Sequence, residues 1–210
     1  MVIKNEVYMP KTGGEITRKK ILETAEMLFS EKGFDGTGME EIASKTGINK
    51  ATIYYHFKSK NEIMEALIHI VLEELEEHLK STGNDNALEK TDDVADKIQK
   101  EISFIMSKQK IISIMMMESL KSDDTNNFLF KCAELTINSE IQAHQNAYKL
   151  NLKKNLEKEY FVYEFFTGFI PFIMYVIFKD KWMKYFNMEE KELMKYFMKA
   201  FKNTHIEGHF

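Results

Sequence analysis

The chain has 210 residues and a formal net charge of -4. Its hydrophobic fraction of 44% can build a core, which excludes a disordered chain, and its single cysteine excludes an intramolecular disulfide. With only two prolines and nine glycines, the composition favours helices over strands. The N-terminus has no apolar segment of the kind that signal peptides carry. We therefore expect an all-α protein of one or two domains in the reducing cytoplasm.

The first part of the chain predicts short helices separated by tight turns. Apolar residues at helical spacing predict a helix from about Thr17 to Lys32, which Gly33 would close. A second helix is expected to start at Thr37, where a capping box would bring the Glu40 carboxylate back to the cap. Gly47 follows this helix and supplies the positive φ that a tight turn needs.

The next two helices have clear start signals. Asn49 is a favourable N-cap for a third helix, Lys50 to about Phe57. Ser59 to Glu62 form a second capping box, which opens a long fourth helix through Leu79. Polar and glycine residues at 81–86 end it. The apolar periodicity of the remainder predicts helices only, at about residues 91–107, 110–121, 127–150, 156–185 and 189–203.

One stretch of this acidic chain is free of acidic residues. Between Lys45 and Asn61 there are four lysines and no carboxylate. Charge alone leaves a binding partner and an accident of sequence equally open, because solvated surfaces normally mix signs. Three short helices with a glycine turn before the third form a helix-turn-helix arrangement. The third helix would then present a cationic face to the major groove, and DNA repels carboxylates.

Residues 15–75 resemble the DNA-binding domain of the tetracycline-repressor (TetR) family of bacterial transcriptional regulators. About fifty residues match without a gap, through TRKKILETAEMLFSEKGF and DGTGMEEIASKTGINKATIYYHFKSKNEI. The resemblance implies a recognition helix at about residues 49–57. It also implies a helical ligand-binding and dimerisation domain at 76–210, where only the all-helical layout matches.

The resemblance also implies which residues contact DNA. They are Thr37, Asn49, Lys50, Ala51, Thr52, Tyr54, Tyr55, His56 and Lys60. Lys50 would reach a base edge or a phosphate, and Lys60 would clamp a phosphate at the start of the fourth helix. Ala51 and Gly38 depart from the glycine and the Ser or Thr common at those positions. Taken singly, Tyr54 could be a core residue and the two lysines ordinary surface residues. The joint pattern favours DNA contacts.

The most apolar segment is Tyr160–Phe178, nineteen residues with one charge, Glu164. Its length allows a transmembrane helix. Glu164, Gly168 and Pro171 favour instead a helix buried between its own domain and a second subunit, and Pro171 should kink or weaken it. The resemblance implies a homodimer built from the last two long helices, so we expect no membrane association.

The second domain is rich in methionine, with fourteen in the chain and three in a row at 115–117. Core filling explains this, and so does an adaptable apolar pocket. The resemblance implies a small molecule that binds here and releases DNA. Candidate lining residues are Met116, Met117, Leu120, Cys132, His144, Tyr148, Phe165, Phe169 and Met174. Glu118 or Glu164 could balance the charge of a cation.

Spacing supports no catalytic Ser-His-Asp or Cys-His set, and we predict no enzyme activity, metal or cofactor. The pairs Glu140 with His144 and His205 with His209 are compatible with metal binding but common on surfaces. The sequence therefore predicts a ligand-responsive repressor that binds a palindromic operator as a homodimer and is released by a small apolar or cationic effector. Alternatives are an architectural or non-specific DNA binder, and a small-molecule-binding protein without operator function.

Overall fold

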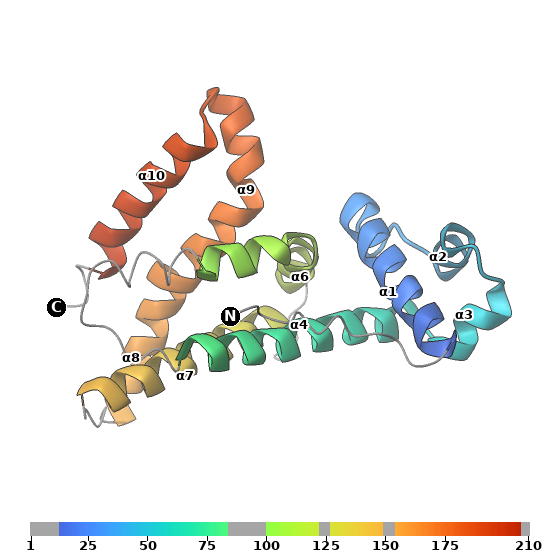
Figure 1. Ribbon diagram of the computed structural model, residues 1–210, viewed down its shortest axis with the longest axis horizontal. Coiled ribbons are helices and arrows are strands. Elements are labelled where there is room, and N and C mark those ends of the chain that lie inside the picture. The colour runs from blue at the N-terminus through green and yellow to red at the C-terminus, as the bar shows by residue number, and fades with distance from the viewer. Residues whose placement is uncertain (1–12, 84–99, 122–126, 149–153, 207–210) are drawn as a thin grey trace, which may run out of the picture. The chain divides into compact units, whose positions relative to one another are not determined.

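The computed structural model describes residues 13–83, 100–121, 127–148 and 154–206, and all regular structure in these ranges is helical (Figure 1). The all-α prediction is confirmed. The chain divides into two compact units, Met1–His69 and Ile70–Phe210. The division falls within helix α4, Lys60–Gly83. The sequence-based domain boundary at residues 75–76 lies in the same helix and stays a prediction.

The first unit contains three helices and the start of α4. The three are α1 (Gly13–Lys32), α2 (Met39–Thr46) and α3 (Lys50–His56). Their apolar residues recur at helical spacing and meet in one core, because each helix buries one face. The buried core residues include Ile21, Leu22, Ala25, Leu28, Phe29, Ile42, Ala43, Ile53, Phe57 and Ile63. The predicted helix-turn-helix is therefore present.

The turns around α2 partly follow the sequence prediction. Gly33 and Gly47 both have positive φ, 78° and 76°, as expected for the glycines that close α1 and α2. The capping box at Thr37 is wrong, because α2 is capped by Gly38 without a side-chain bond. The Thr37 hydroxyl donates to the Gly33 carbonyl at 2.9 Å and is thus drawn into the preceding turn. The Glu40 carboxylate pairs with Lys50 instead.

The N-caps of α3 and α4 agree with the sequence prediction better than the cap of α2 does. Asn49 Oδ1 accepts the backbone N–H of Thr52 at 2.8 Å, which confirms Asn49 as the N-cap of α3. Ser59 Oγ accepts the Glu62 N–H at 3.2 Å at the start of α4. The Glu62 carboxylate accepts the N–H of Lys58 at 2.6 Å, one residue before the cap. These local bonds fix where α3 and α4 begin.

The second unit holds the C-terminal part of α4 and the remaining helices. These are a helical segment at 100–107, α6 (Gln109–Lys121), α7 (Phe128–Tyr148), α8 (Lys154–Tyr163), π-helical η1 (Glu164–Phe169), α9 (Ile170–Phe186), α10 (Glu190–Phe201) and π-helical η2 (Lys202–Ile206). One core cluster centres on Ile102, Tyr175 and Val176. A second centres on Ala133, Ile137 and Ile141. The predicted helices agree with this layout where the structure describes them; residues 91–99 and 149–150 of the predictions lie outside the described residues.

Helices α8 and α9 run on through η1 as one long helix, as predicted for residues 156–185. The Ile170 N–H bonds to the Phe165 carbonyl, five residues back, so η1 has a wider turn than an α-helix. Pro171 follows directly and has no N–H to donate. The helix continues past Pro171 as α9, and the kink or weakening expected there stays a prediction.

The long helix Lys158–Phe186 has 29 residues and is apolar enough to cross a membrane by length and composition. Only 28% of its most apolar window is buried within the single chain. One such helix is also compatible with the core of a soluble protein. Its exposed side chains are therefore the feature that needs an explanation.

Candidate nucleic-acid interface

Helix α3 has a buried face and an exposed face. Ile53 and Phe57 are fully buried, and this fixes the rotation of the helix about its axis. Tyr55 is 79% exposed and Tyr54 is 37% exposed. Lys50 is exposed as well. Ile53 and Phe57 thus face inward, and the outward face is polar and aromatic.

At each end of α3, neighbouring side chains contact one another. Asn49 Oδ1 accepts the Thr52 hydroxyl at 2.9 Å in addition to the backbone N–H. Ala51 next to them is exposed. At the other end the His56 ring is half-buried and meets the Tyr55 ring edge-on at 5.2 Å. All of these residues therefore lie on or beside one short helix whose orientation the core fixes.

The acid-free stretch of sequence is not free of carboxylates in space. The Lys50 ammonium forms an ion pair with the Glu40 carboxylate of α2. This hydrogen bond, with the attraction of the charges, raises the pKa of Lys50 and lowers the pKa of Glu40. Both side chains are exposed. The fold thus brings to the start of α3 an acidic residue that the linear window of residues 45–61 lacks.

Two predicted phosphate contacts have internal partners. Lys60 Nζ donates to the Phe34 carbonyl at 2.8 Å and lies within 3.5 Å of the carbonyls of Asp35 and Thr37. The ammonium also lies 4.4 Å from the centre of the Phe34 ring. The Thr37 side chain is buried. Lys60 therefore ties the start of α4 to the loop between α1 and α2.

This geometry agrees with known DNA-binding proteins. Residues 21–67 match the model of the tetR family of bacterial regulatory proteins. The chain is 52% identical over 48 residues to IcaR, the HTH-type negative transcriptional regulator of the biofilm operon icaADBC in Staphylococcus aureus (strain Newman). The likeness to the tetR family thus lies in the N-terminal unit, which holds the matched residues. The match to IcaR covers 23% of this chain and 26% of IcaR, so it spans about a quarter of that relative.

Solved structures extend the likeness to the whole fold. A transcriptional regulator (TerR/AcrR family) from Aquifex aeolicus VF5 superimposes with a TM-score of 0.64 and 22% identity, covering 89% of this chain and 96% of that one. SmeT from Stenotrophomonas maltophilia, in complex with triclosan, has a TM-score of 0.58 and 18% identity, with 90% of each chain covered. At these identities the likeness shows that this chain shares their fold.

The second unit brings two of the predicted ligand-binding residues together. Phe165 and Phe169 of η1 pack against Ala133, Ile137 and Ile141 of α7. Their rings are stacked with centroids 6.0 Å apart. The two phenylalanines therefore form part of an apolar cluster between two helices.

The other predicted ligand-binding residues vary in exposure. Cys132 is buried, and burial raises the pKa of its thiol to about 12. Leu120 is 80% exposed, and Met117 is exposed as well. Met116 and Met174 are half-buried. The side chains of His144 and Tyr148 lie outside the described residues. Which of these residues line a pocket stays a prediction.

Both proposed counter-charges have partners within the chain. Glu118 pairs with Lys121 at 2.7 Å. Glu164 is only 2% exposed, and its Oε2 lies 3.4 Å from His205 Nε2. A Cβ added at Gly168 would lie 2.8 Å from His205 Cε1, so the imidazole needs a glycine beside it. Burial, together with the nearby carboxylates of Glu164 and Glu140, raises the pKa of Tyr160. The sequence singled out both Glu164 and His205, but not as partners of one another.

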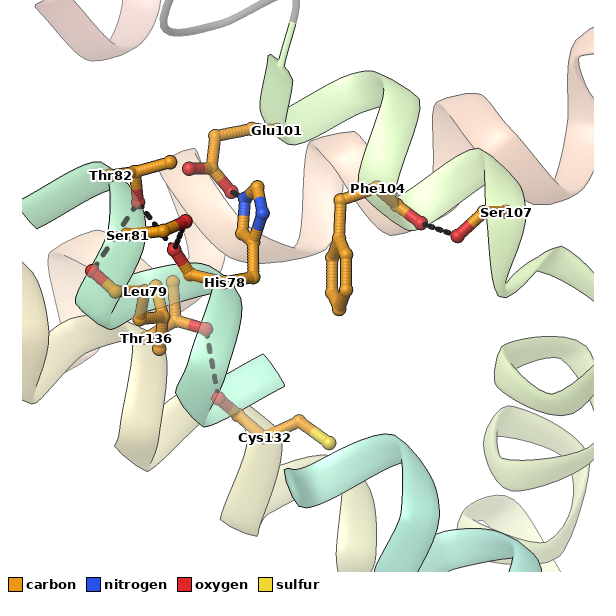
Figure 2. A network of polar contacts seen from close by, with 9 residues as sticks. All are labelled: His78, Leu79, Ser81, Thr82, Glu101, Phe104, Ser107, Cys132 and Thr136. Atoms are coloured by element: carbon orange, nitrogen blue, oxygen red, sulfur yellow. Dashed lines mark hydrogen bonds and ion pairs between the residues drawn. The ribbon is translucent and has the colours of Figure 1, made fainter. Parts of the chain in front are cut away.

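The contacts of α4 within the second unit had no signal in the sequence. His78 Nε2 lies 3.0 Å from Glu101 Oε2, and the imidazole stacks on Phe104 with centroids 4.3 Å apart (Figure 2). Lys108 pairs with Glu74 at 2.5 Å. These contacts attach α4 to the helical segment that carries Glu101 and Phe104.

The long helix α8–η1–α9 exposes large apolar side chains to solvent. We call this set the apolar strip; it comprises Val162, Phe166, Phe178, Trp182, Tyr185 and Phe186. Soluble monomers rarely leave so many large apolar groups exposed on one element. The strip is therefore a candidate interface.

Proposed function

We propose that this chain is a transcriptional repressor that binds an operator as a homodimer and leaves it when a small molecule binds the second unit. The exposed, polar face of α3 carries the proposal. Ile53 and Phe57 hold that face outward. The surrounding sequence is half identical to a negative transcriptional regulator. A cationic helix in a helix-turn-helix is suited to the major groove of DNA.

In this proposal α3 supplies the direct contacts. Lys50 reaches a guanine edge or a phosphate, and Ala51 approaches a thymine methyl group. Tyr54 and His56 donate to phosphates, and Tyr55 contacts backbone or base. Asn49 and Thr52 hydrogen-bond phosphate at the N-terminus of α3. Lys60 and Thr37, whose side chains have internal partners, support the site by holding the loop before α2.

The apolar strip is the proposed dimer surface. A second copy of the chain would cover it and remove large apolar side chains from water. A twofold dimer would also place two α3 helices on half-sites of a palindrome, one helical turn of about 34–36 Å or a multiple of it apart. This assembly works in the cytoplasm, where the genome is, and needs no membrane.

The second unit is the proposed effector site. SmeT, which shares the fold, has been solved with triclosan. The apolar cluster around Phe165 and Phe169 suits a small apolar effector, and an aromatic site also suits a cation. Release of DNA would be a shift between two dimer states. The effector must distinguish the states by several kcal/mol, because about 5.5 kcal/mol inverts a 1:99 equilibrium.

Selection from a pool of genomic fragments tests the proposal. The purified dimer should enrich a palindromic fragment, and Tyr55→Ala, which removes an exposed ring, should reduce the enrichment while leaving the helical content unchanged. Equal binding to selected and random duplexes at matched salt would favour the architectural alternative. Failure of the dimer to bind any duplex would leave the small-molecule-binding alternative.

A further inference from the structure

The ion pair between Lys50 and Glu40 links the recognition helix to the helix before it. Lys50 is the first residue of α3, and Glu40 lies in the first turn of α2. Since the core fixes both helices, the two exposed side chains extend from backbone positions that stay within reach of one another. Lys50 has a hydrogen-bond acceptor before any DNA arrives.

DNA has to compete with this carboxylate. On random sequence a phosphate offers Lys50 one charge in exchange for another, and Glu40 is left unpaired beside a polyanion that repels it. At an operator a guanine edge offers two acceptors in fixed positions, O6 and N7, so Lys50 gains directed bonds as compensation. The exchange is therefore less favourable on random DNA than at the operator.

We propose that Glu40 is a specificity-determining residue, which keeps Lys50 from phosphates on random DNA and releases it at the operator. This inference rests on the proposed function. Glu40 itself contacts no base in this scheme. It acts by keeping the Lys50 ammonium paired, so that binding to random DNA costs free energy that binding to the operator recovers.

The chain contains a matched control in the next residue. Glu41 also lies in the first turn of α2 and also forms an exposed ion pair, but its partner is Lys32 of α1. Glu40→Gln and Glu41→Gln therefore remove the same charge from adjacent positions. Only Glu40→Gln frees Lys50.

The test measures binding of the full-length dimer to a random duplex and to the selected operator between 50 and 200 mM salt. With Glu40→Gln, log affinity for random DNA should fall more steeply with log salt, by about 0.9, because one more lysine displaces counterions. At low salt its affinity for random DNA should rise several-fold more than its affinity for the operator. Glu41→Gln should leave the slope and the operator-to-random ratio near the wild-type values.

Two outcomes overturn the inference alone. One is an equal effect of the two variants, since Glu40 would then act only through its net charge. The other is a Lys50→Ala/Glu40→Gln double variant that keeps the steeper slope, since Lys50 would not be the residue released. If the wild type and every variant fail to bind any duplex, the proposed function fails, and the inference fails with it.

Discussion

The exposed face of α3 in the first unit is polar, whereas α8, η1 and α9 in the second unit expose the apolar strip. Water can solvate the Tyr55 hydroxyl and the Lys50 ammonium, so this face needs no permanent partner. Trp182 and Phe178 cannot remain in water without cost. The first surface therefore suits a reversible ionic partner, and the second suits a lasting apolar one.

The largest expected effect comes from a charge in the apolar strip. Phe178→Glu should weaken dimerisation at least about a hundredfold, because the carboxylate would be buried without a partner at the interface. Sedimentation velocity across a concentration series measures the change. Operator affinity should fall together with dimerisation, because a monomer contacts only one half-site. Weak binding to random DNA should persist.

Leu120→Glu is the matched control, because Leu120 is exposed on α6 outside the strip. It should leave the dimer intact. Equal weakening by both variants, or none by Phe178→Glu, would contradict the assignment of the strip as the interface.

A smaller effect is expected at Lys60. A variant at this position tests whether Lys60 contacts DNA or stabilises the loop between α1 and α2. Lys60→Met keeps the apolar stem over Phe34 but leaves the loop carbonyls without their donor. Unfolding free energy should fall by about 1.5–3 kcal/mol, the usual range for a hydrogen bond to a charged group. Chemical denaturation measures this. The salt slope of DNA binding should change by less than one.

Lys45→Met, which removes an exposed charge at the end of α2, is the comparison variant. It should leave stability nearly unchanged. If instead Lys60→Met retains full stability and lowers the salt slope by about one, Lys60 contacts a phosphate directly, as the family resemblance implies.

Local features of this fold could be predicted from the sequence, and non-local ones could not. The Asn49 cap, the Gly47 turn and the inward pair Ile53 and Phe57 depend on residues a few positions apart, whose types fix the backbone. The Lys50–Glu40 pair depends instead on how two helices meet. The periodicity of a single helix does not show which residues of two helices come into contact. The acid-free stretch therefore predicted a cationic surface without the Glu40 carboxylate.

The same limit applies more strongly to the second unit. Its helices were predictable because apolar spacing is a local signal. The candidate pocket required the rotation of several long helices at once, and an error of one residue turns a side chain by about 100°. Leu120, proposed as a lining residue, is largely exposed for this reason. Glu164, proposed as a counter-charge, faces His205 instead of open space.

Alkaline pH should affect the second unit through Cys132. Its thiol pKa rises from 9.0 to about 12 on folding. Between these values the unfolded chain loses the proton while the folded chain keeps it, so stability falls as pH rises. The stabilisation is complete below pH 9 and should decline by about 1.4 kcal/mol per pH unit above it. Denaturation at pH 9 and 10 should show a smaller decline in Cys132→Ala. Identical declines would mean that the thiol titrates normally.

The smallest effect is expected at Tyr175, which is 7% exposed and whose buried hydroxyl has no hydrogen-bond partner among the described residues. Removing an unpaired buried hydroxyl removes its desolvation cost. Tyr175→Phe should therefore leave the unfolding free energy unchanged or raise it by up to about 1 kcal/mol. Tyr163→Phe is the comparison, because the Tyr163 hydroxyl donates to the carbonyls of Thr204 and His205 at 3.0 Å each. That variant should lose about 1 kcal/mol. A similar loss in Tyr175→Phe would mean that a water molecule or a bound effector satisfies the hydroxyl, and the second unit would then be wetter inside than its apolar lining implies.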